Sequence, residues 1–252
     1  MSLSYNPVIS IITVCFNSEK TIEATILSVL NQNYKNIEYI IIDGKSKDNT
    51  VKIISKYQNN LGYFISEADT GIYDAMNKAL DVVTGDWVYF LGSGDIMLNV
   101  LDKIVTRLVN PNFVYYGDVY RNDLLKVFNG YFSAFQFSRD SICHQAIFYP
   151  TKAIKKYKFN NKYKVQADHH LNMLIYGDKN FKFKYFPIII CAYDGTGFSA
   201  TTIDYVFLKD RIEIVRSNFS FPVYLYAYCR NKIAKFIKID HFKNIKSSKQ
   251  LF

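Results

Sequence analysis

The first hundred residues alternate between short apolar runs and amphipathic segments. Apolar runs that end at turn residues occupy 8–14, 37–42, 62–66 and 87–91, and such runs are typical of strands that are covered on both faces. Between the runs, apolar residues recur at the spacing of one helix face. Because strands and helices alternate with short links, we expect an α/β fold with a mostly parallel sheet and helices on both faces.

Acidic residues follow the ends of three of these strands. Asp43 follows the second strand, Glu67 and Asp69 follow the third, and Asp95 follows the fourth. Right-handed crossovers bring the carboxyl ends of parallel strands to one side of the sheet, which is where ligands bind in open α/β folds. The four acids therefore predict a functional site at that edge.

The fourth strand leads into the turn Gly92-Ser93-Gly94-Asp95. Its two glycines allow a sharp turn and close approach of a ligand, and its carboxylate could hold a divalent cation that binds phosphate. Alternatively, Asp95 only caps the next helix. The turn after the first strand, residues 15–20, lacks both the GxGxxG pattern of dinucleotide-binding domains and a P-loop. A metal at Asp95 is therefore the simplest way to hold phosphates.

The same residues form four sequence blocks: SIITVCFNSEKTIEATILSVLNQNY, EYIIIDGKSKDNT, SEADTGIYDAMNKAL and TGDWVYFLGSGD. In content, order and spacing they resemble the family 2 glycosyltransferases of the GT-A fold, which act in bacterial polysaccharide assembly. The resemblance implies that Asp43 contacts the base of a nucleotide-sugar. It also implies that Asp95 is the last acid of a DxD-type motif and ligates Mg²⁺ or Mn²⁺. Gly92 departs from the family pattern, because many members have the first acid of the motif there.

Two further segments of the second half contain candidate catalytic residues. The segment 141–146 contains His144 and Gln145, and the segment 165–171 contains Asp168 in ADHHL. A lone histidine in an apolar context is usually structural, and an acid at the start of a helix is often a cap. The resemblance instead implies that His144 and Gln145 lie on the acceptor side and that Asp168 is the general base of an inverting enzyme.

Two further segments receive no metal-binding or catalytic role. The adjacent His169 and His170 are not expected to bind zinc, because neighbouring helix positions face different sides. The segment 193–199 has the composition of a loop, and we assign it no catalytic role.

The expected substrate-binding residues are Thr13, Asn17, Asp43, Glu67, Asp69, Gly71, Lys78, Ser93, His144 and Gln145.

The C-terminal segment combines aromatic and basic residues. The chain has a net charge of +9, and the positive excess is densest after Arg230, directly behind an aromatic block at 219–228. This pattern predicts a segment that binds an anionic membrane surface, with a solvated basic helix as the alternative. No stretch reaches the roughly eighteen apolar residues of a membrane span, and the first ten residues lack a signal-peptide pattern. We therefore expect a cytoplasmic protein that is peripheral on the inner face of the plasma membrane.

Together these features predict an inverting glycosyltransferase of the hexosyl or N-acetylhexosaminyl class. We expect a UDP-sugar as the donor. The expected acceptor is a hydroxyl of a glycan that is attached to lipid. Two rivals remain, a metal-dependent nucleotidyltransferase and a non-catalytic sugar- or anion-binding protein; nucleic acid is not expected, because clustered acids repel its phosphates. The expected organisation is a donor-binding half (1–98), an acceptor-binding half with the base (99–217) and a basic tail (218–252).

Overall fold

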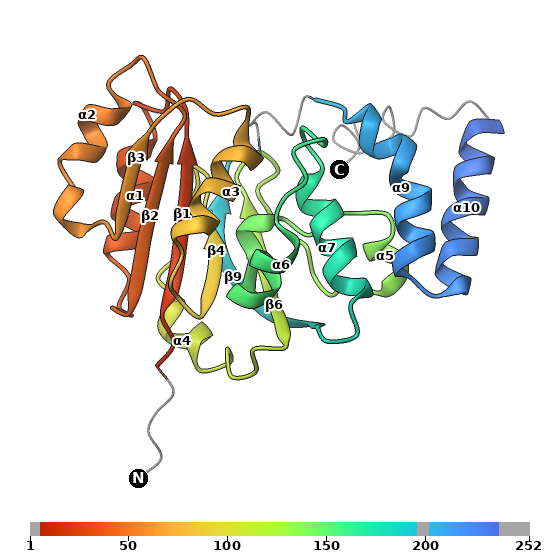
Figure 1. Ribbon diagram of the computed structural model, residues 1–252. Helices are drawn as coiled ribbons and strands as arrows, with labels where there is room; N and C mark the ends of the chain where they lie inside the picture. The colour runs from red at the N-terminus through yellow and green to blue at the C-terminus, as the bar shows by residue number, and fades with distance from the viewer. Residues whose placement is uncertain (1–5, 196–201, 237–252) are drawn as a thin grey trace, which may run out of the picture.

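The computed structural model describes residues 6–195 and 202–236, with side chains described to residue 233. Within these ranges the strands form one nine-stranded sheet, in which helices pack against a central set of strands (Figure 1). The strand order is β3-β2-β1-β4-β8-β6-β9-β5, with β7 paired to β6.

The first half of the sheet is parallel, as the sequence predicts. Strand β1 pairs in parallel with β2 and with β4, and β2 pairs in parallel with β3. Every residue of β1 and β4 is buried, which explains why these strands read as continuous apolar runs. The elements of this half are β1 (Ile9–Cys15), α1 (Ile22–Leu30), β2 (Ile37–Asp43), α2 (Thr50–Ser55), η1 (Gln58–Asn60), β3 (Tyr63–Ser66), α3 (Ile72–Val82) and β4 (Trp87–Phe90).

The second half contains most of the antiparallel pairs. Strand β8 joins the two halves, because it pairs antiparallel with β4 on one side and β6 on the other. The elements of this half are β5 (Ile96–Met97), α4 (Leu101–Val105), β6 (Phe113–Arg121), β7 (Lys126–Phe128), α5 (Ala134–Phe137), η2 (His144–Ala146), β8 (Ile147–Pro150), α6 (Thr151–Tyr157), α7 (Ala167–Gly177), β9 (Lys182–Tyr193), α9 (Tyr205–Asn218) and α10 (Phe221–Phe236).

The long pair β6–β9 is parallel but irregular, with register shifts around Asp118. Gly117 lies at this irregularity, and a Cβ there would come within 2.5 Å of the Ile188 carbonyl oxygen. Glycine is therefore required for the two backbones to approach at this point.

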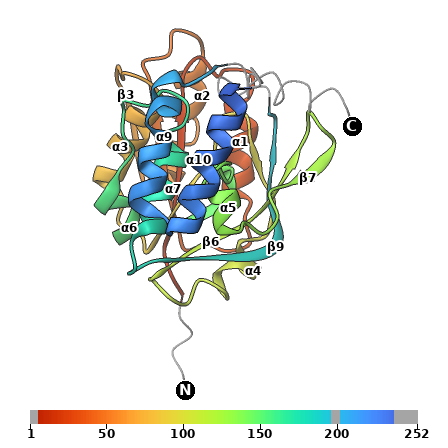
Figure 2. The ribbon, with the colours of Figure 1, turned by 90° about the vertical axis from the view of Figure 1, so that its right-hand side faces the viewer.

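Aromatic side chains fill the core between the sheet and the helices of the second half. The ring of Phe137 packs within 5.5 Å of the rings of Phe132, Tyr176 and Phe183. Helices α9 and α10 lie side by side at this end of the molecule (Figure 2), and Phe135 of α5 meets Tyr226 of α10 edge to face at 5.2 Å. Among the described helices, none combines the length and apolarity that a membrane crossing requires.

Candidate functional site

Asp43 ends β2 and is completely buried. Its carboxylate accepts hydrogen bonds from the Ser46 backbone N at 2.9 Å, from the Ser46 hydroxyl, and from the Ser66 hydroxyl at 2.6 Å. These bonds tie the end of β2 to its own loop and to the end of β3. The structure thus gives Asp43 a structural role at the sheet edge, and its contact with a nucleotide base remains a prediction.

The loop after β3 closes tightly against the loop after β2. Asp69 accepts a hydrogen bond from the backbone N of Gly71 at 2.9 Å, and its other carboxylate oxygen lies 2.5 Å from where a Cβ on Gly44 would be. Gly71 itself has φ of +133°, a conformation that side-chain-bearing residues rarely adopt. Asp69 and Gly71 therefore lie together at the predicted edge, directly before α3.

Glu67 and Lys78 form an ion pair across the same loop. The Lys78 ammonium lies 2.7 Å from the Glu67 carboxylate and donates to the Ala68 carbonyl oxygen at 2.7 Å. The hydrogen bond to Glu67 is the main reason why the pKa of Lys78 is raised. These contacts fasten the loop to α3, so both predicted residues lie at the edge but already have protein partners.

Asp95 is buried at the end of the turn after β4, with 4% of its surface exposed. The Gln145 amide donates to Asp95 Oδ2 at 2.8 Å, and the Asp194 backbone N donates to Oδ1 at 3.4 Å. Burial raises the pKa of Asp95, although the Gln145 hydrogen bond acts in the opposite direction. Because these two donors are uncharged, no hydrogen-bond partner among the described residues neutralises this carboxylate.

Gly92, which stands where the DxD pattern has its first acid, leaves space for the Asp95 carboxylate. A Cβ at position 92 would lie 2.6 Å from Asp95 Oδ2. The observed position of the Asp95 carboxylate is therefore compatible with glycine at 92 and not with a larger residue.

The described part of the chain contains no group of three or more His, Cys, Asp or Glu side chains that could hold a metal ion. Asp95 is a buried carboxylate whose hydrogen-bond donors among the described residues are neutral. A hard divalent cation with oxygen ligands suits such a carboxylate.

Three other predicted residues lie near this edge with different contacts. Thr13 is fully buried inside β1 and hydrogen bonds with the Tyr39 hydroxyl at 3.1 Å, so its side chain does not reach the edge. The Asn17 side chain accepts from the Lys47 backbone N at 2.9 Å and closes a loop. Ser93 reaches the edge, where its hydroxyl lies 2.9 Å from that of Ser18.

Asp168 lies in the first turn of α7, on the far side of the site from the first four strands. Its Oδ2 lies 3.6 Å from His144 Nδ1, and its Oδ1 accepts hydrogen bonds from the His169 backbone N at 2.7 Å and from the Tyr73 hydroxyl at 3.3 Å. The side chain of Asp168 is 13% exposed. Because Gln166 is the N-cap residue of α7, the alternative that Asp168 is the helix cap is wrong.

The short helix η2 lies between Asp95 and Asp168 and contacts both acids. His144 faces Asp168, while the next residue, Gln145, donates to Asp95. A single turn of chain thus contacts one acid on each side. The acceptor-side role of both residues stays a prediction, and the structure adds a contact of Gln145 with the predicted metal ligand Asp95.

The segment that contains the site is similar to a known protein family. Residues 10–175 match the family model described as "Glycosyl transferase family 2". This chain belongs to glycosyl transferase family 2.

Named relatives and solved structures agree with that assignment. A Mycobacterium bovis protein named "PGL/p-HBAD biosynthesis glycosyltransferase" is 31% identical over 214 residues, which are 81% of this chain and 83% of the relative. An uncharacterized glycosyltransferase of Haemophilus influenzae is 37% identical over 105 residues, 40% of this chain and 41% of the relative.

The solved structures show that the family 2 chain has the GT-A type of fold. S. aureus TarS 1–349 in complex with UDP-GlcNAc superposes with a TM-score of 0.65 at 20% identity, over 82% of this chain and 64% of that one. This chain therefore spans less than two thirds of the TarS length. The mannosyltransferase PcManGT from Pyrobaculum calidifontis, in complex with GDP-Man and Mn²⁺, has a TM-score of 0.65 at 12% identity, over 98% of this chain and 85% of its own.

The site of this family 2 chain includes one residue that sequence reasoning missed. The first residue of α3, Ile72, is 42% exposed, whereas the next residue, Tyr73, is buried. Besides reaching Asp168, the Tyr73 hydroxyl donates to the Val165 carbonyl oxygen at 2.7 Å. The signal available in the sequence was a tyrosine beside the apolar face of a predicted helix, because a buried tyrosine hydroxyl usually has a partner.

The two histidines after Asp168 are part of the core. His169 lies 2.9 Å from the Phe137 carbonyl oxygen, and the His170 ring lies 4.8 Å from the Tyr163 ring. His170 Nδ1 is buried and has no hydrogen-bond partner among the described residues. Burial lowers the pKa of both histidines, that of His170 to about 4. Both rings are therefore neutral packing residues at pH 7.

Proposed function

We propose that this chain is an inverting, metal-dependent glycosyltransferase that moves a sugar from a nucleoside diphosphate sugar to a hydroxyl of a glycan. The observation that carries the proposal is the pair of acids, Asp95 and Asp168, which η2 contacts through Gln145 and His144. A UDP-sugar is the expected donor, and a hexose or N-acetylhexosamine the expected sugar. TarS in complex with UDP-GlcNAc and PcManGT in complex with GDP-Man support that class.

In this proposal Asp168 removes the proton of the acceptor hydroxyl. Its Oδ1 is held by the His169 backbone N and the Tyr73 hydroxyl, whereas its Oδ2 lies 3.6 Å from His144 and accepts no hydrogen bond from the described residues. A carboxylate with one fixed and one accessible oxygen has the orientation that a general base needs. Direct attack by the activated hydroxyl on the anomeric carbon inverts that centre.

Asp95 is the residue that would hold Mg²⁺ or Mn²⁺. When bound, such an ion neutralises the charge that develops on a departing diphosphate. In the chain itself, Gln145 orients one oxygen of Asp95 and the Asp194 backbone N the other. Gly92 leaves the room that this orientation needs.

The experiment that tests this function is a screen of UDP-, GDP- and dTDP-sugars for hydrolysis, with Mg²⁺, Mn²⁺ or EDTA. We expect release of the nucleoside diphosphate from one class of donor, only with metal. A nucleotidyltransferase would instead release pyrophosphate from a nucleoside triphosphate and a sugar phosphate. A non-catalytic protein would bind a donor without any turnover, and either result would contradict the proposal.

We further propose that α10 brings this enzyme to an anionic membrane surface, where a lipid-linked acceptor would be available. Phe221, Leu225, Tyr228 and Lys232 follow one another at helical spacing and are all exposed, with Phe221 at 71%. Such a stripe suits an interfacial helix with its basic residue at the headgroups. The basic positions after Phe236, namely Lys238, Lys243, Lys246 and Lys249, and the loop positions 196–199, lie outside the described residues.

Sedimentation with vesicles tests the membrane role. Each basic residue near an anionic surface contributes about 1 kcal/mol, so binding should increase with phosphatidylglycerol content and decrease with salt. Phe221→Ser combined with Leu225→Ser should weaken it. Tyr205→Ser, at an exposed position on α9 (72% exposed), is the matched control. The membrane role would be eliminated if vesicle binding did not depend on lipid charge, or if the double variant bound vesicles as well as the unmodified protein.

A further inference from the structure

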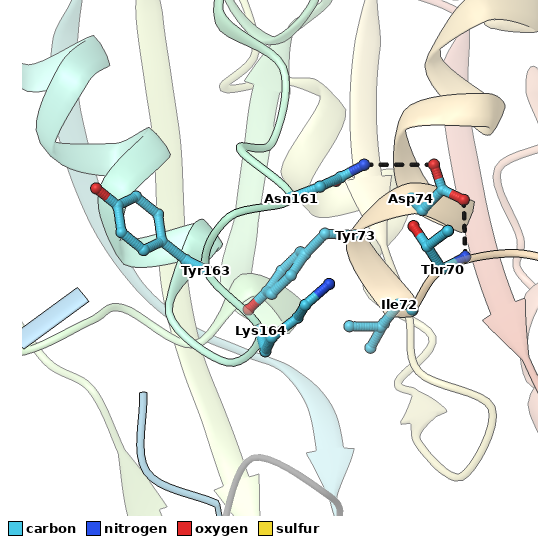
Figure 3. Close-up of a pocket in the computed structure, with 8 residues that line it drawn as sticks. Thr70, Ile72, Tyr73, Asp74, Asn161, Tyr163 and Lys164 are labelled. Atoms are coloured by element: carbon cyan, nitrogen blue, oxygen red, sulfur yellow. Dashed lines mark hydrogen bonds between the residues drawn. The ribbon is translucent and has the colours of Figure 1, made fainter. Parts of the chain in front are cut away.

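A pocket lies between the start of α3 and the loop that precedes α7 (Figure 3). It adjoins the base and is lined by Gly71, one of the expected substrate-binding residues, but by none of the residues that the sequence motifs assign to catalysis or metal binding. Its polar and aromatic lining includes Thr70, Tyr73, Asp74, Asn161, Tyr163 and Lys164.

Hydrogen bonds between the two segments build the polar wall of the pocket. The Asp74 carboxylate accepts from the Thr70 backbone N at 2.9 Å and from the Asn161 amide at 3.3 Å. Asn161 in turn accepts from the Asn77 amide at 3.2 Å. These bonds fix the polar wall, and the carboxylate and the amide groups retain capacity for further hydrogen bonds.

The charges in the pocket favour a neutral ligand with many hydroxyl groups. Lys164 is exposed, and in the part of the chain that the structure describes it has no hydrogen bond or ion pair. Its ammonium extends past Tyr73 toward Ile72 (Figure 3). One cation and one carboxylate, Asp74, line the same space, so a phosphate would meet repulsion as well as attraction. A sugar can accept from Lys164 and donate to Asp74.

The pocket is one side chain away from the base. Tyr73 lines it, and the hydroxyl of the same tyrosine contacts Asp168 Oδ1. We infer that this pocket is a subsite for a sugar unit of the acceptor glycan, next to the unit whose hydroxyl reacts. The inference rests on the proposed function, because it takes Asp168 as the base.

Binding of p-nitrophenyl glycosides of hexoses and N-acetylhexosamines tests the subsite directly. Saturation-transfer difference NMR would follow their binding, and calorimetry would follow UDP binding on the same samples. Lys164→Met removes a cation that has no protein partner among the described residues, and Ile72→Trp narrows the mouth of the pocket. We expect Lys164→Met to weaken glycoside binding roughly tenfold, the effect of losing a hydrogen bond to a charged group. We expect Ile72→Trp to weaken it through steric exclusion of the glycoside. UDP affinity should stay unchanged.

Lys162→Met is the matched control, since Lys162 is an exposed lysine two residues away that pairs with Asp210 at 2.6 Å outside the pocket. It should bind glycosides as the unmodified protein does. The inference is overturned if no glycoside binds, if both pocket variants bind normally, or if UDP affinity decreases in parallel. Failure of the proposed function would appear separately, as the absence of nucleotide-sugar turnover.

Discussion

Asp43 and Asp168 are both acids at the site, but the two halves of the molecule hold them in different ways. Asp43 is completely buried, and its hydroxyl and backbone partners come from the loop and strand end beside it. Asp168 is partly exposed, and its neighbours Tyr73 and His144 come from α3 and η2. The half that we predict to bind the donor is thus built locally at the sheet edge, whereas the half that we predict to bind the acceptor is assembled from distant segments. Loss of the first kind of acid should cost stability, and loss of the second should cost activity.

The largest effect is expected at Asp95, where the two halves meet. Asp95→Asn removes the charge that would hold the metal, and we expect turnover of the nucleotide-sugar to decrease about 10³-fold or more. Because asparagine has nearly the same shape, the melting temperature should change little. Measuring turnover against Mn²⁺ concentration checks this. Full activity of the variant, or full activity of the unmodified enzyme in EDTA, would falsify the metal assignment.

A smaller effect, on stability, is expected for Asp43. Asp43→Ala leaves the Ser46 backbone N and the Ser46 and Ser66 hydroxyls without their acceptor. Each buried donor that loses its partner costs about 1–3 kcal/mol, less any relaxation toward water. Urea unfolding should therefore show a loss of about 3 kcal/mol. Asp81→Ala, at an exposed ion pair with Lys158, is the control and should change little. Equal stabilities of the two variants would remove the distinction between the halves.

The acceptor half should also make stability depend on pH, because it contains His170, whose ring is buried. Burial lowers the pKa of His170 to about 4, against about 6.5 in an unfolded chain. Stability is then fully present above pH 6.5 and is lost as pH falls toward 4, by about 2 kcal/mol at pH 5. His170→Gln should reduce this loss relative to pH 8. If the variant and the unmodified protein lose stability equally between pH 8 and pH 5, the burial of a neutral His170 is not the cause.

The sequence predicted the donor half better than the acceptor half, and the reason is physical. The parallel strands β1, β2 and β4 are buried on both faces, so their apolar runs and the acids behind them are visible locally. Strand β7 ends at Phe128, where its pairing with β6 ends, and the composition of the segment does not record that pairing. The contacts of Tyr73 and Gln145 also depend on tertiary packing, and no spacing along the chain records which distant acid each residue meets.

The central claim is that Asp168 serves the acceptor alone, as the base. The most direct measurement compares Asp168→Asn with the unmodified enzyme for sugar transfer to an acceptor glycoside and for donor affinity, with Asp140→Asn, at an exposed pair with Arg139, as control. We expect transfer to decrease by about 10²–10⁴-fold, the contribution of a positioned base, with donor affinity and melting temperature near those of the unmodified enzyme. Retained transfer, or a collapse of donor affinity with substantial residual turnover, would contradict the account and make Asp168 a binding residue.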